Sequence, residues 1–334
     1  MTRIIGVFSG KGGVGKTTVV ANLALALKEF NKRITVVDCN ITTPHLSYYL
    51  GAYDYPVTLN SVLKGESHIN MASHYHKGIY IVPSSNYISS LSKADVSGLK
   101  DHIKELSKLN DVVIIDSAPG FGREAMSALI SCDEIILVTT PRFPELTDAL
   151  KCFSIAEKLG IRTLGLVVNM AGITNDEYGK NHITAMTGLP VLAEILFDKK
   201  IVESGKRGVP FIHFEPFSKT ADSFRALAAE ILNEDYKPRH ALKRIYSRFK
   251  HKLKRGSMDG TRVNLRFEPK VTTAVDGILD AIKTKEYVNI KDLSKSLGLA
   301  ERDVYGWCDI LESKGLVYVR NTFWGGKAVG FREW

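Results

Sequence analysis

Long apolar runs are missing from this chain of 334 residues: no stretch approaches the roughly 18 residues that a membrane-spanning helix needs. The apolar stretch at residues 4–8 is too short for the core of a signal peptide and is typical of a buried strand. Cysteine is also scarce. The four cysteines are scattered along the chain and form no Cys-x-x-Cys pair. This pattern argues against a disulfide framework, and we expect reduced thiols in a cytoplasmic protein.

Acidic residues are absent from one segment. Residues 236–255 contain nine Lys and Arg and no Asp or Glu, an excess equal to the net charge of +9 of the whole chain. Residues 271–334, by contrast, carry nine charges of each sign. The basicity of the protein is therefore local, and an anionic partner is to be sought at residues 236–255.

Strand-like and helix-like stretches alternate over residues 1–235. Their apolar runs are continuous rather than alternating, which is typical of parallel strands buried on both faces of a sheet. Helical periodicity lies between the runs, as at residues 17–30 and 145–159. We therefore predict a doubly wound α/β domain with a mostly parallel sheet. The predicted strands are residues 3–8, 34–37, 79–82, 112–115, 135–138 and 164–168.

Two further parts follow this domain. Residues 236–260 form a basic connector that ends in the flexible sequence Gly-Ser-Met-Asp-Gly. Residues 261–334 are predicted to form a small α+β module that resembles a winged helix-turn-helix. Its predicted helices are residues 273–283, 290–297 and 301–314, and its predicted strands are residues 316–320 and 328–332.

A glycine-rich loop joins the first predicted strand to the first predicted helix. It runs from Gly10 to Thr17 and matches the phosphate-binding pattern GxxxxGK[ST]. Glycines let backbone N–H groups surround phosphate oxygens, and the helix N-terminus adds partial positive charge. Lys16 is predicted to reach the β- and γ-phosphates, and Thr17 to ligate Mg²⁺. The predicted nucleotide-binding residues of this stretch are Gly10, Lys11, Gly12, Gly13, Val14, Gly15, Lys16, Thr17 and Thr18.

A carboxylate follows a later apolar run. Asp116 comes directly after residues 112–115, at the carboxyl end of a predicted strand. A carboxylate in this place is typical of the magnesium-binding strand of P-loop NTPases, so we expect Asp116 to hold Mg²⁺ through water. The sequence Ser-Ala-Pro-Gly that follows suits a loop that responds to the γ-phosphate.

The glycine-rich loop reads KGGVGKT from Lys11, and it resembles the deviant Walker A motif of the MinD/ParA family of ATPases. Further stretches resemble the same family, and archaeal-type MinD in particular, so that the resemblance covers residues 1–233. These stretches are Val36-Val37-Asp38 with residues 42–46, Thr139-Thr140-Pro141 with Thr147-Asp148-Ala149, and Leu166-Val167-Val168-Asn169. The resemblance implies a P-loop ATPase that uses ATP and Mg²⁺ and forms an ATP-bound homodimer.

The resemblance also implies roles for individual residues. Lys11 matches the lysine that reaches across the dimer to the ATP of the partner subunit. Asp38 matches a carboxylate near the attacking water and Mg²⁺, and Asn169 matches an adenine-binding residue. The predicted catalytic positions are Lys11, Lys16, Asp38 and Asn40. A departure lies at Asn40, where the family usually has an acidic residue; because an amide is a poor base, we expect slow basal hydrolysis.

The basic connector has helical periodicity. If residues 238–255 form a helix, five apolar side chains fall on one stripe, with Lys and Arg around the rest. Such a helix suits the surface of an anionic membrane, and MinD proteins carry a membrane-targeting helix at this place. We therefore expect a cytoplasmic protein that docks on the inner face of the cell membrane when ATP is bound. The predicted membrane-contacting residues are Leu242, Ile245, Tyr246, Phe249 and Leu253.

Alternatives remain open at this point. The connector could pack on the ATPase domain or bind nucleic-acid phosphates. The module at residues 261–334 is close to neutral, which favours protein interaction over DNA binding. Asp148 is a candidate contact for a regulator. A ParA-like DNA-partitioning ATPase and a DNA-binding regulator are the rival functions to a MinD-like switch that positions a cellular assembly. Cys132 alone is not expected to bind an iron–sulfur cluster.

Overall fold

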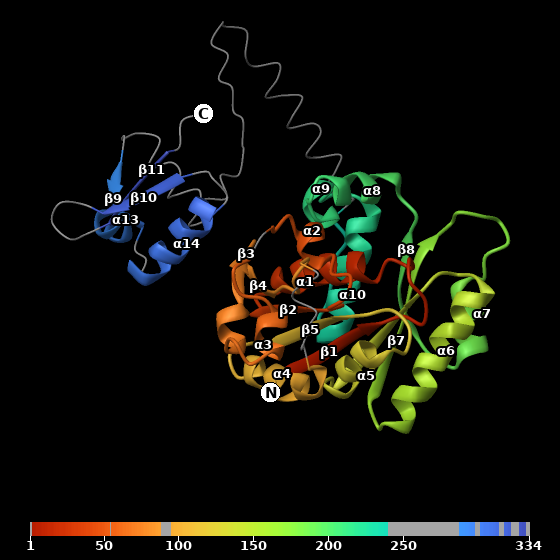
Figure 1. The fold of residues 1–334 in the computed structure, drawn as a ribbon. Helices are drawn as coiled ribbons and strands as arrows, with labels where there is room; N and C mark the ends of the chain where they lie inside the picture. The colour runs from red at the N-terminus through yellow and green to blue at the C-terminus, as the bar shows by residue number, and fades with distance from the viewer. Residues whose placement is uncertain are drawn as a thin grey trace, which may run out of the picture. The chain divides into compact units, whose positions relative to one another are not determined.

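The computed structural model describes residues 2–53, 55–87, 95–239, 287–297, 301–313, 317–321 and 327–331. The chain divides into two compact units, residues 1–256 and residues 257–334. Each unit is described by itself (Figure 1).

An eight-stranded sheet forms the centre of the first unit, in the order β3-β4-β2-β5-β1-β6-β7-β8. Every pairing is parallel except that of β3 with β4. The doubly wound, mostly parallel α/β fold predicted from the sequence is therefore confirmed. The strands are β1 (Arg3–Phe8), β2 (Ile34–Cys39), β3 (His74–His76), β4 (Ile79–Val82), β5 (Val112–Ser117), β6 (Glu134–Thr139), β7 (Arg162–Ala171) and β8 (Val191–Leu196).

Helices of the first unit lie between these strands. The two that the sequence analysis predicts begin one and two residues earlier than expected, at Lys16 and Phe143. The helices of four or more residues are α1 (Lys16–Lys28), α2 (Leu46–Leu50), α3 (Leu59–Leu63), α4 (Leu99–Ser107), α5 (Arg123–Ile130), α6 (Phe143–Lys158), α7 (Lys180–Thr187), α8 (Lys199–Lys206), α9 (Phe211–Phe214) and α10 (Lys219–Leu232). Short 3₁₀ turns lie at Ile69–Ala72 and Val96–Gly98.

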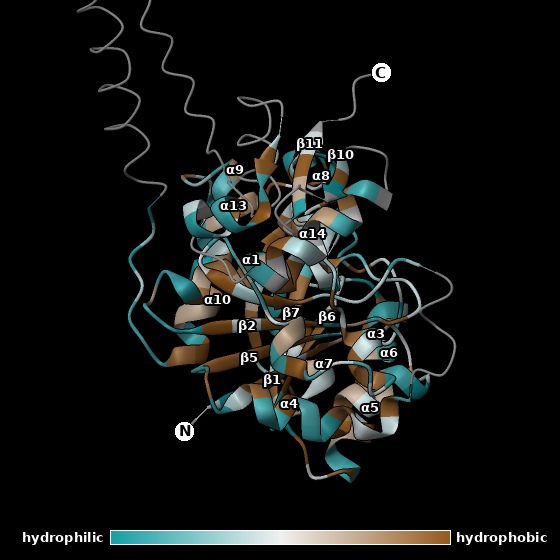
Figure 2. Ribbon diagram, turned by 60° about the vertical axis from the view of Figure 1, so that its left-hand side comes forward, coloured by the Kyte–Doolittle hydropathy of each residue, from teal (hydrophilic) through white to brown (hydrophobic). Residues whose placement is uncertain are grey.

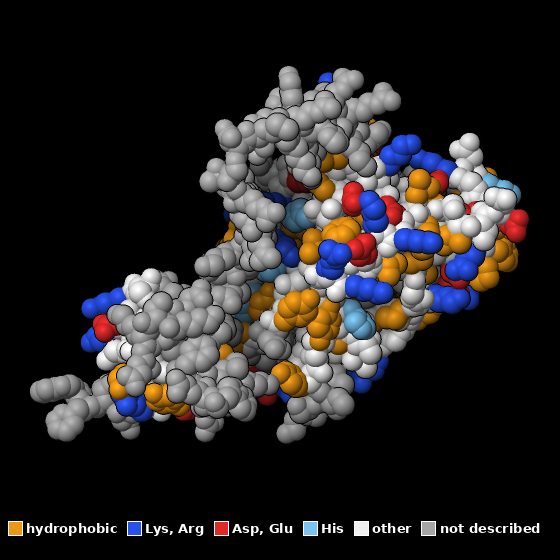
Figure 3. Space-filling view, turned by 90° about the horizontal axis from the view of Figure 1, so that it is seen from above, with side chains coloured by type: hydrophobic (Ala, Val, Ile, Leu, Met, Phe, Trp, Pro, Cys, Tyr) orange, Lys and Arg blue, Asp and Glu red, His pale blue; other side chains and the backbone are white. Residues whose placement is uncertain are grey.

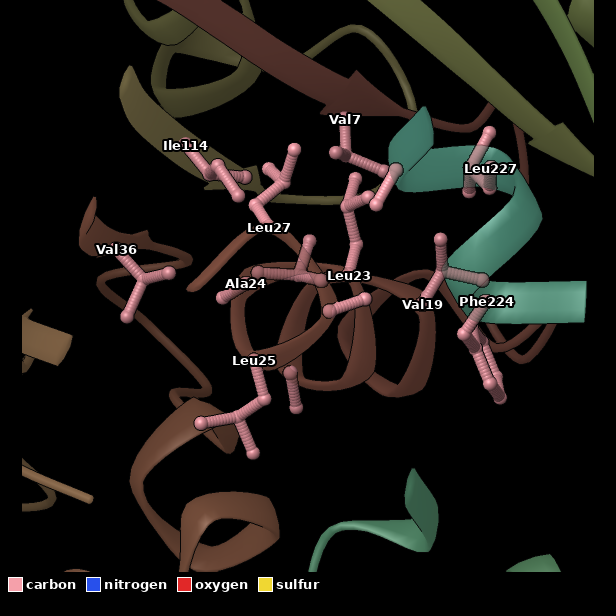
Figure 4. Close-up of a cluster of buried hydrophobic side chains, with 14 of the residues drawn as sticks. Val7, Val19, Leu23, Ala24, Leu25, Leu27, Val36, Ile114, Phe224 and Leu227 are labelled. Atoms are coloured by element: carbon pink, nitrogen blue, oxygen red, sulfur yellow. The ribbon is translucent and has the colours of Figure 1, made fainter. Parts of the chain in front are cut away.

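Hydrophobic side chains cover both faces of the sheet. Within β2, Val36 belongs to the core cluster under α1 and α10, and the next residue, Val37, belongs to the cluster under α4, α5 and α6. Figure 4 shows Leu23 and Leu27 of α1 between strand residue Ile114 and the helix α10. The central strands are accordingly mostly hydrophobic (Figure 2), with Asp38 and Asp116 near the carboxyl ends of β2 and β5, which explains why their sequences contain continuous apolar runs.

Two strands of the first unit were not among those predicted. β8 alternates buried and partly exposed residues, as an edge strand does, and β3 has three residues. Neither produces the continuous apolar run from which the inner strands were predicted, because an edge strand is not buried on both faces.

The second unit contains a three-stranded antiparallel sheet in the order β10-β11-β9. Its elements are β9 (Val288–Asn289), α13 (Ile290–Leu297), α14 (Glu301–Ser313), β10 (Val317–Asn321) and β11 (Lys327–Phe331). The two helices and the paired strands lie where the sequence predicts them. The predicted helix at residues 273–283 and the turn between β10 and β11 lie outside the described residues, so the winged-helix assignment stays a prediction.

The predicted membrane contacts also lie outside the described residues. Leu242, Ile245, Tyr246, Phe249 and Leu253 belong to the stretch 240–286, which the structure does not describe. Among the residues that it does describe, no helix is both long enough and apolar enough to cross a membrane.

Candidate functional site

The glycine-rich loop lies between β1 and α1 and has the shape of an anion cradle. Gly13 and Gly15 have φ values of +83° and +88°, a left-handed conformation that favours glycine. A side chain at Gly13 would meet nothing within 4 Å, so the loop is open at this residue. No side chain caps the first turn of α1, which leaves its backbone N–H groups to a ligand.

Lys16 holds the carboxylate at the end of β5. The Lys16 side chain is 7% exposed, and its Nζ lies 2.8 Å from Oδ1 of Asp116, which is 1% exposed. Lys16 Nζ also donates to the backbone carbonyl of Ser117. The structure therefore brings together two of the predicted site residues, the phosphate-loop lysine and the magnesium-binding carboxylate.

Asp38 lies opposite Asp116 in the register of β2 and β5 and is fully buried. Its carboxyl oxygens accept hydrogen bonds from the backbone N–H groups of Asn40 and Leu46, each at 3.1 Å. Burial and, second, the charge of Asp116 raise the pKa of Asp38 to about 8, against the opposing effects of these hydrogen bonds and of Lys16. A cation bound beside Asp38 would favour the ionised form of its carboxyl group.

The oxygen donors at this place fit Mg²⁺. Thr17 lies half-buried in the first turn of α1, and Asp38 and Asp116 lie one residue before the ends of neighbouring strands, so the fold offers one hydroxyl and two carboxylates to a cation. Mg²⁺ is bound in such sites through one or two carboxylates together with water and phosphate oxygens. Among the described residues, no group of three or more His, Cys, Asp and Glu forms a separate metal site.

Asn40 begins the loop between β2 and α2. Its side-chain amide donates to the carbonyl of Thr43 at 2.5 Å, and its Oδ1 accepts from the hydroxyl of Thr43 at 3.1 Å. Both ends of the amide are thus engaged within the loop. Asn40, which departs from the family pattern, is therefore part of a local turn, and its side-chain oxygen already accepts a hydrogen bond.

Lys11 contacts a residue that the sequence analysis did not single out. Its Nζ lies 3.2 Å from Oε1 of Glu145 in the first turn of α6, and Arg142 lies 3.4 Å from the same oxygen. Glu145 is 7% exposed, and its other carboxylate oxygen is buried without a hydrogen bond. Burial acts to raise the pKa of Glu145, but the Lys11 hydrogen bond and the nearby positive charges lower it overall.

Asn169 lies at the carboxyl end of β7, beside the glycine-rich loop. Its Nδ2 donates to the carbonyl of Val14 at 2.8 Å, and a Cβ on Gly15 would lie 2.1 Å from that nitrogen. The loop and the strand end are therefore packed against each other.

Thr18 is buried in the first turn of α1, where its carbonyl accepts from Asn22. Asp148 pairs with Lys151 on the α6 surface.

The glycine-rich loop joins a central parallel strand to a buried helix, and its lysine binds the carboxyl end of the neighbouring strand β5. This arrangement defines a P-loop NTPase. Residues 1–232 match the family model named ParA and described as NUBPL iron-transfer P-loop NTPase. The chain therefore belongs to the ParA/MinD family of P-loop NTPases.

Relatives of known name agree with this assignment. An uncharacterized ATP-binding protein of Methanocaldococcus jannaschii is 32% identical over 237 residues, which cover 71% of this chain and 90% of the relative. The septum site-determining protein MinD of Thermotoga maritima is 29% identical over 244 residues, covering 70% and 89%.

Solved structures extend the comparison to the fold. The cell division ATPase MinD of Pyrococcus furiosus is 37% identical, with a TM-score of 0.68, over 70% of this chain and 99% of that one. MinD of Pyrococcus horikoshii, solved with Mg-ADP, is also 37% identical with a TM-score of 0.68, over 69% of this chain and 96% of that one.

The iron-transfer description of the family model does not fit the cysteines of this chain. All four cysteines are buried, and burial raises the pKa of Cys132 and Cys39 and raises that of Cys152 to about 12. Cluster binding requires thiolates, which burial in an apolar setting disfavours. Cys132 Sγ instead donates to the carbonyl of Ala128.

Proposed function

We propose that this protein is an ATP- and Mg²⁺-dependent switch ATPase that dimerises with ATP and then docks on an anionic membrane. The observation that carries the proposal is the buried set of Lys16, Asp116 and Asp38 at the mouth of the glycine cradle. The Mg-ADP bound to the P. horikoshii MinD supports ATP and Mg²⁺ as its ligands. The proposed reaction is the hydrolysis of ATP to ADP and phosphate.

The residues of the cradle divide the work of binding. Backbone N–H groups from Gly10 to Thr18 surround the phosphates, and Lys16 moves its ammonium group from Asp116 to the β- and γ-phosphate oxygens. Thr17, Asp38 and Asp116 would hold Mg²⁺, which supplies charge neutralisation. Asn169, packed on the loop, is proposed to bind the adenine.

Hydrolysis is proposed to be slow because Asn40 is no base. Its amide bonds with Thr43, and an amide cannot take a proton from water at neutral pH. Asp38 is proposed to lie near the attacking water. A long-lived ATP-bound state follows from slow turnover, and a protein partner would then set its lifetime.

Dimerisation is proposed to redirect Lys11. Lys11 is 55% exposed and is held by Glu145 within its own subunit. In an ATP-bound dimer it would reach the nucleotide of the partner subunit, where a triphosphate offers more negative charge than one carboxylate. The two states of Lys11 thus provide the ATP-dependent step.

Membrane docking is proposed for the connector on the strength of its sequence. Each Lys or Arg near an anionic surface contributes about 1 kcal/mol, and one short amphipathic helix binds reversibly. Two connectors in one dimer would bind far more tightly through effective concentration. In the view of Figure 3, Lys and Arg of the described residues are interspersed with Asp and Glu, so this face offers no field of one sign.

DNA binding is the rival function, and the described face of α14 weighs against it. Its exposed side chains include Glu301, Asp309 and Glu312, which would repel phosphates. We therefore favour protein interaction for residues 261–334. The proposed biological role is the positioning of a cellular assembly, as for septum site-determining relatives.

Co-sedimentation of the full chain tests this proposal. Phosphatidylglycerol vesicles and duplex DNA are compared in Mg-ATP and in Mg-ADP. We expect ATP-dependent vesicle binding that Phe249→Glu abolishes and that Ser247→Glu, an equal charge change off the apolar stripe, largely retains. ATP-dependent binding to DNA and none to vesicles would replace the membrane proposal with the partitioning one.

A further inference from the structure

Glu124, the second residue of α5, binds a segment far from it in the sequence. Its Oε2 accepts hydrogen bonds from the backbone N–H groups of Ile41 at 3.0 Å and Thr42 at 3.4 Å. Its Oε1 accepts from the hydroxyl of Thr42. One carboxylate thus receives three donors from two consecutive residues of the loop between β2 and α2.

That loop carries Asn40, one of the predicted catalytic positions, and follows the strand that holds Asp38. It begins after Cys39, and the Asp38 carboxylate in β2 binds both ends of the loop by accepting from the N–H groups of Asn40 and Leu46. Thr42 and Thr43 are exposed, whereas the side chain of Ile41 is buried. Glu124 therefore fixes the backbone of the loop at its middle, directly after Asn40.

Glu124 also stands at the end of the second loop at the cradle. The chain from Asp116 to α5 passes Gly120, which has a φ of +76° and donates its N–H to the carbonyl of Ser9 at 3.1 Å. The loop before α5 is thus bonded to the residue that directly precedes the glycine-rich loop. The Glu124 carboxylate is a direct link between this second loop and the loop after β2.

We propose that Glu124 is a positioning residue that couples these two loops and so aligns Asp38 and Asn40 for hydrolysis. A carboxylate bonded to two backbone N–H groups transmits displacement, since its bonds are directional and it is covalently part of α5. When phosphate binding orders the Gly120 loop, the loop after β2 is ordered with it. The inference rests on the proposed ATPase function.

A purely structural reading of Glu124 exists and makes a different prediction. A carboxylate in the first turn of a helix interacts favourably with the helix dipole and contributes about 0.3–1 kcal/mol of stability. In that case removal of the charge would lower thermal stability and leave turnover unchanged. The amide variant separates the two readings, because Gln keeps an acceptor oxygen for the loop but loses the charge.

The test compares Glu124→Ala, Glu124→Gln and Thr42→Val with Glu157→Ala, an exposed α6 glutamate, as the control. For each full-length variant, kcat, KM, ATP affinity and hydrogen exchange of residues 40–46 are measured with Mg-ATP. We expect Glu124→Ala to lower kcat about 10- to 100-fold with ATP affinity within about threefold, since small misplacement of reacting groups costs that much. Glu124→Gln should stay within about threefold of wild type, and Thr42→Val should lie between them.

The exchange measurement keeps the proposal open to refutation if turnover is very slow. ATP should protect residues 40–46 together with residues 118–124 in the wild type, and only the latter in Glu124→Ala. Joint protection and normal kcat in Glu124→Ala would overturn the inference, as would equal losses in the Gln and Ala variants. If the wild type binds no ATP, the proposed function itself fails, and that result is read separately from the affinity arm.

Discussion

Lys11 makes an ion pair within its own subunit, and a different contact is proposed for it in the ATP-bound dimer. Its ion pair with Glu145 is made inside one subunit and leaves the other oxygen of a nearly buried carboxylate unbonded. A buried charge with an unfilled acceptor is costly, so Glu145 has capacity for a further donor. The pair therefore gives Lys11 a defined position within one subunit without satisfying Glu145 completely.

At Asn40 we predict that restoring a carboxylate speeds hydrolysis. Asn40→Asp supplies an acceptor for a proton beside Asp38, and positioned acid–base groups contribute about 10²–10⁴-fold to rates. We expect at least about a tenfold rise in kcat, measured by phosphate release from the purified protein in Mg-ATP. Equal rates for the wild type and Asn40→Asp would show that the amide does not limit turnover.

Gly15 is predicted to accept no side chain. Gly15→Ala would place a Cβ 2.1 Å from Asn169 Nδ2 on a backbone with φ of +88°, and a left-handed alanine costs roughly 1–2 kcal/mol before the clash is counted. Calorimetric titration should show loss of ATP binding. Gly179→Ala is the control, because its added Cβ meets nothing within 4 Å and its φ is −72°; a normal titration by Gly15→Ala would contradict the cradle.

The sequence predicts some site residues and misses others for a physical reason. Lys16 and Asp116 belong to local patterns whose spacing carries the chemistry, so they can be found without a fold. Glu124 and Glu145 acquire their roles from contacts 82 and 134 residues away in the chain. Such partners are set by sheet order and helix placement, and the only local signal is an acidic residue in the first turn of a helix.

Among the elements, α1 and α10 show how the cover of the sheet is joined. Arg225 of α10 is 2% exposed, and its guanidinium binds both carboxylate oxygens of Glu29, which follows α1. The same guanidinium donates to the carbonyl of Pro216. A buried bidentate pair of this kind fixes the orientation of the two helices.

Removal of Arg225 is predicted to destabilise this face. Arg225→Ala removes the bidentate partner of Glu29, which keeps its contact with Arg239, and a partner of Asp222, so it should lower the free energy of unfolding by about 2 kcal/mol or more. Denaturant unfolding followed by circular dichroism measures this. Arg207→Ala, which breaks an exposed pair with Glu203, should cost under about 0.5 kcal/mol; equal losses in both variants would show that burial of the pair is not what matters.

Element prediction worked where burial was two-sided. Inner strands such as β5 gave continuous apolar runs, and α13 was placed at its observed ends. β3 and β8 lie at the two edges of the sheet, where a strand has a single neighbouring strand. Their short or alternating patterns resemble those of loops, and only the paired structure distinguishes them.

At the scale of the whole molecule, the family model ends at residue 232, so the comparisons describe the first unit. The basic connector and residues 261–334 extend the chain beyond it. The proposed switch needs two parts of the chain, because residues 1–232 would provide ATP-dependent pairing and the connector would provide surface affinity. The membrane-docking role proposed for the connector rests on its charge and its apolar stripe, which are properties of the sequence.

ATP-gated dimerisation is the central claim, and sedimentation velocity of the full chain measures it most directly. In millimolar Mg-ATP the wild type should sediment as a dimer, and in Mg-ADP as a monomer. Lys11→Ala should bind ATP yet remain a monomer, while Lys151→Ala, a change of equal charge on α6, should dimerise normally. A wild-type chain that stays monomeric with ATP demonstrably bound would contradict the claim.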